Sequence, residues 1–449
     1  MKTELLSPAG TIQNMRYAFA YGADAVYAGQ PRYSLRVRNN DFKDKNLEVG
    51  IKEAHRLGKK FYLTSNLMPH NTKVKTYMRD LEPVIDLGPD AIIMADPGLI
   101  MMVREKWPEM PVHLSVQANT VNFAAVKFWQ KQGIERIILS RELSLDEVEE
   151  IRQECPEMEL EVFVHGALCI AYSGRCLLSG YFNHRDPNQG TCTNSCRWDY
   201  KTVETEENAE GVYKPTERIA GNTVQIHTPF PAEIGQGDRH PLADKTYMLE
   251  EKNRPGEHTT ITEDEHGTYI MNSKDLRAVE HVERLVKIGI DCLKIEGRTK
   301  SHYYVSRVTQ SYRQAIDAAE QGKSFDPNLL GDLENLANRG YTDGFFQRHH
   351  THKYQNYIDS HSMSRQQQYV GQILSYDKTS GIAEIEVKNK FGNGDKLQLV
   401  TPEGNEDIVV ENMVDQHGKS LEVALGSGYF VKMQLPQNTN EQSLLARYL

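Results

Sequence analysis

Four of the six cysteines in this 449-residue chain lie within one short segment, and such a grouping points to shared chemistry. They are Cys169, Cys176, Cys192 and Cys196, spaced as C-x6-C-x15-C-x3-C. Thiolates grouped in this way hold a metal ion or an iron–sulfur cluster, act as nucleophiles, or pair as disulfides. Which of these applies decides most of what the chain can do.

The spacing of the cysteines favours one of these uses without excluding the others. Structural zinc sites use two C-x2–4-C pairs, and only the second pair here has such a spacing. An iron–sulfur cluster accepts looser spacing, because its four thiolates need only converge on one inorganic core. An iron–sulfur cluster is therefore the first hypothesis, with zinc, a catalytic cysteine and disulfides as the alternatives.

The compartment bears on the disulfide alternative. The N-terminal sequence MKTELLSPAGTIQNMRYAFA has no apolar run followed by a small-residue cleavage site, and no stretch of the chain has the ~18 uninterrupted apolar residues of a membrane helix. We therefore expect a cytoplasmic protein, with no membrane partner and with reduced thiols. The net charge of −10 argues against a protein that coats nucleic acid, but it allows a local basic groove.

A histidine near the cysteines raises the question of a hydrolase. His165 lies four residues before Cys169. A Cys/His pair needs a hydrogen bond between the two side chains and a third group that orients the base. The chain has neither a G-x-S-x-G nor an H-E-x-x-H motif, so a hydrolase remains only an alternative.

Eight short apolar runs must position these residues. Runs of this kind suit parallel strands that are buried on both faces, and amphipathic stretches separate them. The runs are 4–10, 24–30, 60–67, 90–98, 112–119, 136–143, 160–168 and 292–298. Eight such βα units predict an α/β fold, a TIM-like (β/α)8 barrel, rather than an open sheet.

Local signals mark where the intervening helices begin and end. Ser144 followed by Glu147 predicts an N-terminal capping box. Gly22, Gly58 and Gly133 stand where helix C-terminal glycines are expected.

The domain organisation follows from the interruption of this pattern. We predict a barrel over 1–321, with an insertion over 170–268 that contains the cysteines and is too long for an ordinary loop. A helical or linker segment is expected over 322–368. Period-two alternation over 369–449 predicts a small antiparallel β-barrel.

Polar side chains stand at the downstream ends of the apolar runs, where a (β/α)8 barrel carries its functional residues. Arg141 follows the sixth run, His165 lies near the end of the seventh, and Glu296 and Arg298 end the eighth. These four are the candidate catalytic residues.

Several blocks of the sequence resemble a known family. The run EVFVHGALCIAYSGRCLLS over 161–179 closely resembles the signature of the collagenase-like peptidases of family U32. ELLSPAG, GADAVYAG, LKIEGR and RGYTDGFF resemble further blocks of that family, so the resemblance covers nearly the whole chain.

The resemblance implies a redox enzyme rather than a protease. Better-understood relatives are oxygen-independent hydroxylases of RNA bases or quinone precursors that carry a 4Fe-4S cluster. NQGTCTNSCRW and MNSKDLRA are most similar to the members that act on tRNA. This implies prephenate-dependent 5-hydroxylation of the wobble uridine, with Cys169, Cys176, Cys192 and Cys196 as the cluster ligands.

The same resemblance implies the partners: a tRNA anticodon loop, a small-molecule hydroxyl donor and an electron donor. Prephenate carries two carboxylates, so a clamp of Arg141, Arg298 and Lys300 is expected.

Single-stranded RNA is held by aromatic side chains beside basic ones. Arg32, Arg36 and Arg38, which follow Tyr27 and surround Tyr33, give such a pattern. Together with Asn119 and Lys300, the three arginines are the candidate substrate-binding residues. The alternatives are a peptidase and a zinc-stabilised RNA-binding protein.

Overall fold

The computed structural model describes most of the barrel and all of the C-terminal domain. The described residues are 2–29, 32–35, 41–168, 274–336, 338, 340–347 and 367–449, with the backbone of short strands between 200 and 268. The four clustered cysteines, Arg36 and Arg38 lie outside the described residues, so the predictions made for them stay predictions.

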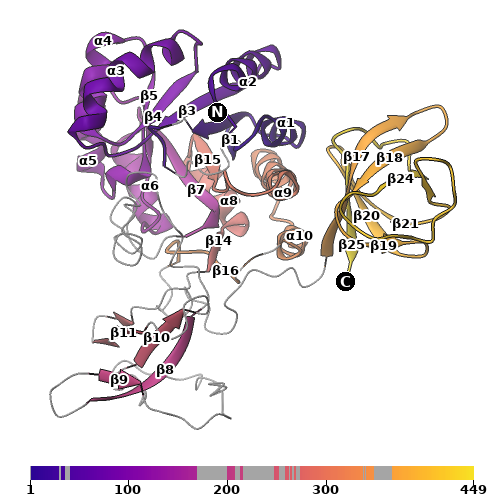
Figure 1. Cartoon of the computed structure of the whole chain (residues 1–449). Coiled ribbons are helices and arrows are strands. Elements are labelled where there is room, and N and C mark those ends of the chain that lie inside the picture. The colour runs from indigo at the N-terminus through magenta and orange to yellow at the C-terminus, as the bar shows by residue number, and fades with distance from the viewer. Residues whose placement is uncertain are drawn as a thin grey trace.

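Eight parallel strands form a closed barrel, as the sequence predicts (Figure 1). Each lies within one of the eight apolar runs or within one residue of it. They are β1 (Glu4–Pro8), β2 (Ala25–Gly29), β3 (Lys60–Ser65), β4 (Ala91–Met94), β5 (Val112–Leu114), β6 (Arg136–Ile138), β7 (Glu159–Ala167) and β15 (Cys292–Ile295). The barrel closes because β15 pairs in parallel with both β1 and β7.

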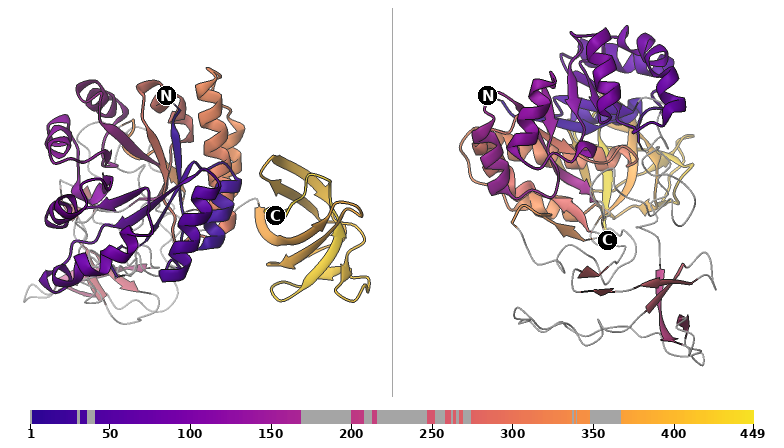
Figure 2. Two further views of the ribbon diagram at one scale, coloured as in Figure 1. Left: turned by 90° about the horizontal axis from the view of Figure 1, so that it is seen from above. Right: turned by 90° about the vertical axis from the view of Figure 1, so that its left-hand side faces the viewer.

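Helices surround the barrel on its outer side, as the views in Figure 2 show. They are α1 (Ile12–Ala20), α2 (Asp44–Arg56), α3 (Asn71–Ile85), α4 (Pro97–Lys106), α5 (Phe123–Lys131), α6 (Leu145–Glu154), α8 (Val282–Ile288) and α9 (His302–Glu320). The predicted capping box of Ser144 and Glu147 is present at the start of α6. Gly22, Gly58 and Gly133 have φ of 103°, 67° and 77°, which confirms their place just after helices.

The sheet extends beyond the barrel next to β7. Strand β14 (Asp275–Arg277) pairs antiparallel with β7, and β16 (Tyr341–Thr342) pairs with β14. Helix α10 (Asn328–Glu334) lies between α9 and β16 in the sequence. The boundaries predicted for the three parts of the chain stay a prediction.

A separate small sheet belongs to the segment between β7 and β14. It has the order β11-β10-β8-β9. Its strands are β8 (Tyr200–Glu207), β9 (Tyr213–Pro215), β10 (Tyr247–Glu251) and β11 (His258–Ile261), and a two-stranded pair of β12 (Glu263–Asp264) with β13 (Gly267–Thr268) follows.

The C-terminal domain is an antiparallel sheet of seven strands in the order β21-β20-β25-β17-β18-β24-β22. The strands are β17 (Gln367–Asp377), β18 (Ile382–Val387), β20 (Lys396–Thr401), β21 (Gly404–Val409), β22 (Val414–Asp415), β24 (Phe430–Gln434) and β25 (Leu444–Tyr448), with β19 (Phe391–Gly392) pairing β23 (Val423–Ala424).

The prediction of a closed barrel for this domain is wrong. Over 367–449, all of which the structure describes, the end strands β21 and β22 do not pair with each other. The physical reason lies in the end strands: β22 has two residues, and β21 carries exposed polar residues such as Glu406 and Asp407 that keep its edge in water.

The C-terminal domain packs on α1 and α9 (Figure 2). Val400 and Leu444 join the hydrophobic cluster of the barrel. The hydroxyl oxygen of Tyr21, the residue after α1, lies 2.9 Å from the carbonyl oxygens of both Val400 and Gln442. The two parts therefore pack against each other through apolar contacts, while the C-terminal domain also has a hydrophobic core of its own. Among the described residues, no helix is long and apolar enough to cross a membrane.

Candidate active site

The carboxyl ends of the barrel strands carry a buried polar network. In β3, side chains alternate between the helix layer and the barrel interior, so that Phe61 packs on Phe42 while Tyr62 makes an edge-to-face contact with His113 of β5. The same alternation directs Thr64 and Asn66 inward, at the end of the strand. Both side chains are nearly inaccessible, with exposed fractions of 3% and 8%.

Arg298 spans the mouth of the barrel. Its Nη1 donates to Thr64 Oγ1 at 2.9 Å, and its Nη2 donates to the carbonyl oxygen of Leu35 at 2.5 Å. Arg298 follows β15, which is separated from β3 by β1 and β2 in the sheet order. Side chains from non-neighbouring strands meet only across the interior, so this guanidinium lies over the barrel mouth.

A second part of the network joins β3 to the turn after β5. The N–H of Leu35 donates to Asn66 Oδ1 at 3.2 Å, and Asn66 Nδ2 donates to Gln117 Oε1 at 3.0 Å and to Ser115 Oγ at 3.3 Å. The hydroxyl of Ser115 also donates to Gln117 Oε1. Gln117 lies in the short 3-10 helix η1 (Val116–Ala118) and is 6% exposed. Arg298, Leu35, Asn66 and Gln117 therefore form one continuous hydrogen-bonded chain.

Arg141 and Glu296 form a buried ion pair between the ends of β6 and β15. Arg141 Nη2 and Glu296 Oε2 are 3.0 Å apart, and the guanidinium carbon lies 3.8 Å from the ring centre of Phe163. The structure thus brings together two of the four candidate catalytic residues. Gly166 makes room for this arrangement, because its φ is +106° and a Cβ there would lie 2.5 Å from the carbonyl oxygen of Glu296.

His165 faces the helix layer instead of this network. Its ring packs against Tyr304 and Tyr312 of α9 and Tyr341 of β16, and Nδ1 lies 3.3 Å from the hydroxyl of Tyr312. Burial, together with the positive charges of Lys300 and Arg277, lowers the pKa of His165 to about 3. The ring is therefore neutral at pH 7, and its position favours a structural role over proton transfer at the mouth.

The candidate substrate-binding residues divide into two groups. Asn119 and Lys300 lie close to the mouth: Asn119 Nδ2 donates to the carbonyl oxygen of Gln117 at 2.9 Å, and Lys300 Nζ lies 5.1 Å from the ring centre of Tyr304. Arg32 points elsewhere. It has a φ of +76° and its Nη1 pairs with Asp80 of α3 at 2.5 Å.

Charged side chains fill the barrel interior below the mouth, and this part of the interior is called the floor. Arg136 Nη1 lies 2.6 Å from Glu4 Oε1 and 3.6 Å from Glu161 Oε2. Lys294 Nζ lies 2.7 Å from Glu161 Oε1. Burial would raise the pKa of Glu4, but Arg136 and Lys60 outweigh it and hold that pKa below its usual value. Lys294 Nζ lies 4.4 Å from the ring centre of Tyr27, which connects the floor to the mouth. Charged side chains thus take the place of the branched apolar layers usual in such barrels.

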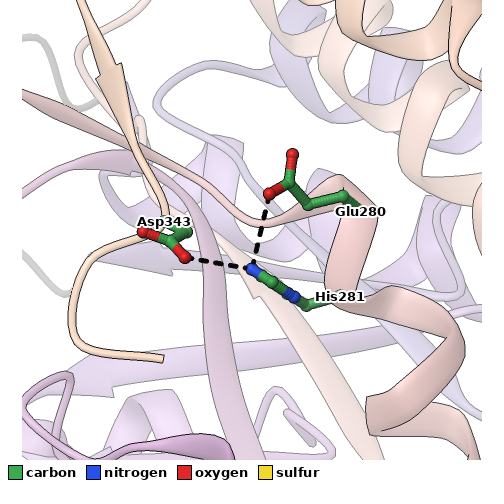
Figure 3. Close-up of side chains that lie close together, drawn as sticks. All are labelled: Glu280, His281 and Asp343. Carbon is green, nitrogen blue, oxygen red and sulfur yellow. Dashed lines mark hydrogen bonds and ion pairs between the residues drawn. The ribbon is translucent and has the colours of Figure 1, made fainter. Parts of the chain in front are cut away.

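Glu280, His281 and Asp343 form a separate cluster outside the barrel (Figure 3). His281 Nε2 lies 3.2 Å from Asp343 Oδ2 and 3.6 Å from Glu280 Oε1. Among the described residues this is the one group whose ligand-type atoms all lie within 4.8 Å of one another. A hydrogen bond between His281 of η4 (Val279–His281) and Asp343 in the turn after β16 accounts for the geometry.

The candidates chosen from the sequence omit Asn66, Ser115 and Gln117. A signal was available, because Asn66 and Gln117 stand at the downstream ends of the third and fifth apolar runs. The sequence could not show that side chains from strands separated by β4 meet. Their importance follows only from the closure of the barrel.

Comparisons with known proteins agree with this architecture. The family model described as Peptidase family U32 matches residues 10–356, and the model described as Peptidase family U32 C-terminal domain matches residues 365–446.

Individual relatives match over almost the whole chain. A protein of Escherichia coli (strain K12) named tRNA hydroxylation protein P is 59% identical over 442 residues, which cover 97% of this chain and 94% of the relative. A protein of the same name from Haemophilus influenzae is 56% identical over 449 residues, covering 100% of this chain and 96% of the relative. A Porphyromonas gingivalis protein named Collagenase is 27% identical over 419 residues, covering 89% of this chain and 86% of the relative.

Proposed function

The chain belongs to peptidase family U32, and from this membership we propose that it hydroxylates tRNA. The observation that carries the proposal is the 59% identity, over 97% of the chain, to a protein named for tRNA hydroxylation. The specific reaction proposed is oxygen-independent, prephenate-dependent 5-hydroxylation of the wobble uridine.

The cofactor proposed for this reaction is a 4Fe-4S cluster held by Cys169, Cys176, Cys192 and Cys196. Leu168, the last described residue before them, directly follows β7, so the chain leaves the carboxyl end of the barrel immediately before Cys169. When bound, such a cluster supplies one-electron chemistry that side chains lack. Thiolate ligands in a four-cysteine set suit iron–sulfur binding.

The described residues have roles in binding the substrates. Arg141 and Lys300, at the mouth, are the proposed partners for the carboxylates of prephenate. Arg298 holds the segment 32–35 over the mouth through Leu35, which helps to exclude water from the reacting groups. The anticodon loop is proposed to approach the same face.

A peptidase is the second candidate, because a relative named Collagenase matches 89% of the chain. Geometry gives it little support. Among the described residues, no hydrogen bond joins a serine or cysteine side chain to the ring of a histidine, and the described cysteines, Cys155 and Cys292, are buried. Cleavage of casein or denatured collagen by protein that has lost its iron would support a peptidase.

The proposal is tested by nucleoside mass spectrometry of tRNA from a strain that lacks this protein, grown without oxygen. We expect 5-hydroxyuridine and its derivatives to disappear and to return when the full chain is supplied. Cys169→Ser and Cys176→Ser should not restore them. Cys155→Ser, at a buried thiol outside the cluster, is the matched control and should restore them. Unchanged nucleosides in the deletion strain would reject the function, and metal analysis of protein purified without oxygen separates iron from zinc.

A further inference from the structure

The direction of the hydrogen bonds around Gln117 fixes how its amide points. Gln117 Oε1 accepts from both the Ser115 hydroxyl and Asn66 Nδ2. Rotating the amide by 180° would place its NH2 group against the Asn66 donor. Asn66 is itself fixed, because its Oδ1 accepts the N–H of Leu35 at 3.2 Å. The amide nitrogen of Gln117 is therefore directed away from the network.

The Nε2 amide of Gln117 is the donor at the end of this hydrogen-bonded network. Within the part of the protein that the structure describes, no hydrogen bond of Gln117 Nε2 is found, although the residue is only 6% exposed. Asn66 and Ser115 come from the ends of β3 and β5, which β4 separates, so the group lies at the mouth of the barrel. The nitrogen is not among the fully buried side-chain atoms that lack a partner, so it keeps accessible surface through which an incoming acceptor can reach it.

Because the Gln117 amide is uncharged, it favours a neutral acceptor over a charged one. A neutral NH2 group in a water-poor site suits a neutral carbonyl oxygen, whereas carboxylates are better matched by guanidinium groups such as that of Arg141. Uracil presents a carbonyl oxygen at position 4, where cytosine presents an amino group. A fixed donor thus accepts uracil and opposes cytosine.

Resting on the proposed function, we propose that Gln117 selects the base by donating its amide N–H to O4 of the uracil. Asn66 is the positioning residue that holds the Gln117 amide in the orientation that donates. Cytosine in the same place would set two donors against each other, and the unmade hydrogen bond corresponds to about a 10- to 100-fold loss of affinity.

Two substitutions would each present a hydrogen-bond acceptor to the base in place of the Gln117 donor. Gln117→Glu replaces the donor by an acceptor of similar shape. Asn66→Asp leaves the Leu35 bond intact but removes the Nδ2 donor, so the Gln117 amide turns over and presents its oxygen to the base. The second variant acts without contacting the base, which distinguishes positioning from direct contact.

The test measures binding of two anticodon stem-loop RNAs that differ only by U or C at the wobble position. Full-length protein, purified without oxygen, is titrated by fluorescence anisotropy. We expect the unmodified protein to prefer the U-containing RNA, and both variants to lower the U-to-C affinity ratio at least tenfold. Asn122→Asp is the matched control. It adds the same negative charge at the exposed N-cap of α5, where aspartate also accepts the Ala125 N–H, and it should leave the ratio unchanged.

The outcomes separate the two proposals. If the unmodified protein restores tRNA hydroxylation in cells and both folded variants keep its U-to-C ratio, the role of Gln117 is rejected and the function stands. If the unmodified protein restores no hydroxylation, the function and the inference built on it are rejected together.

Discussion

Buried charges inside the barrel show how single residues constrain each other. Glu161 has no exposed surface and lies 2.7 Å from Lys294 and 3.6 Å from Arg136, whose side chains are 3% and 4% exposed. Such a group stabilises the fold only while its charges balance, because removing one partner leaves another buried charge uncompensated. The same residue-level logic applies at the mouth, where Arg141 and Glu296 neutralise each other.

Glu161→Gln should lower the free energy of unfolding by about 3 kcal/mol, because Lys294 and Arg136 lose a buried counter-ion. Urea denaturation measures the change. Glu159→Gln is the matched control, since Glu159 also binds Arg136, at 2.8 Å, but its side chain is 52% exposed. Glu159→Gln should lower the free energy of unfolding by less than about 1 kcal/mol. Equal losses in the two variants would contradict a special role for the buried network.

At the scale of elements, the pairing of β7 with β15 determines where the site residues stand. The register shifts between Lys294 and Ile295, where β15 passes β7. Gly166 then approaches the backbone of Glu296 so closely that only glycine fits, at a φ of +106°. This close approach sets Glu296 beside Arg141 and turns His165 toward α9.

Gly166→Ala should therefore destabilise the protein by several kcal/mol, since the added Cβ would lie 2.5 Å from the carbonyl oxygen of Glu296. Gly289→Ala separates the clash from backbone strain. Gly289 has a φ of +85°, but nothing lies within 4 Å of a Cβ placed there. The free energy of unfolding of Gly289→Ala should therefore fall by only about 1–2 kcal/mol. The midpoints of urea unfolding give both values, and similar losses would show that the contact with Glu296 is unimportant.

At the scale of the whole molecule, the C-terminal domain has its own hydrophobic core and is coupled to the barrel through an interface on α1 and α9. His302 of α9 lies in that shared interface, with Nε2 2.9 Å from the hydroxyl of Tyr369 and its ring 4.9 Å from that of Tyr17. Burial and the nearby Lys388 lower the pKa of His302 to about 4, with Glu386 acting in the opposite direction. The interface thus depends on a neutral histidine.

Stability should fall as the pH is lowered from about 6.5 to about 4. In this range the unfolded chain binds a proton at His302 that the folded protein excludes, so the contribution is complete above pH 6.5 and is lost toward pH 4. We expect a loss on the order of 2 kcal/mol from this residue, with His165 acting in the same direction. The difference between the free energies of urea unfolding at pH 7.5 and at pH 5 measures this loss.

His302→Gln should reduce the difference in unfolding free energy between the two pH values. His417→Gln changes an exposed histidine and is the control that should keep the full difference. A pH dependence that is identical in both variants would show that the interface does not depend on the protonation of His302.

The sequence by itself determined the parts that local patterns encode. The eight apolar runs, the capping box at Ser144 and the glycines after α1, α2 and α5 are all found where they were predicted, because strand burial, helix capping and left-handed turns depend on residues close together in the chain. The family resemblance was likewise available from continuous blocks of sequence, and the comparisons confirm it.

Only the tertiary structure decided which polar residues meet. The network of Arg298, Leu35, Asn66 and Gln117 joins segments far apart in the chain, and it exists because closure of the barrel brings non-neighbouring strand ends together. His165 lies near the end of a barrel strand as predicted, yet its side chain packs on α9 because the backbone around Gly166 is irregular. The edges of the C-terminal sheet remain open for a similar reason: alternation predicts strands, but pairing between the first and last strand is a property of the assembled sheet.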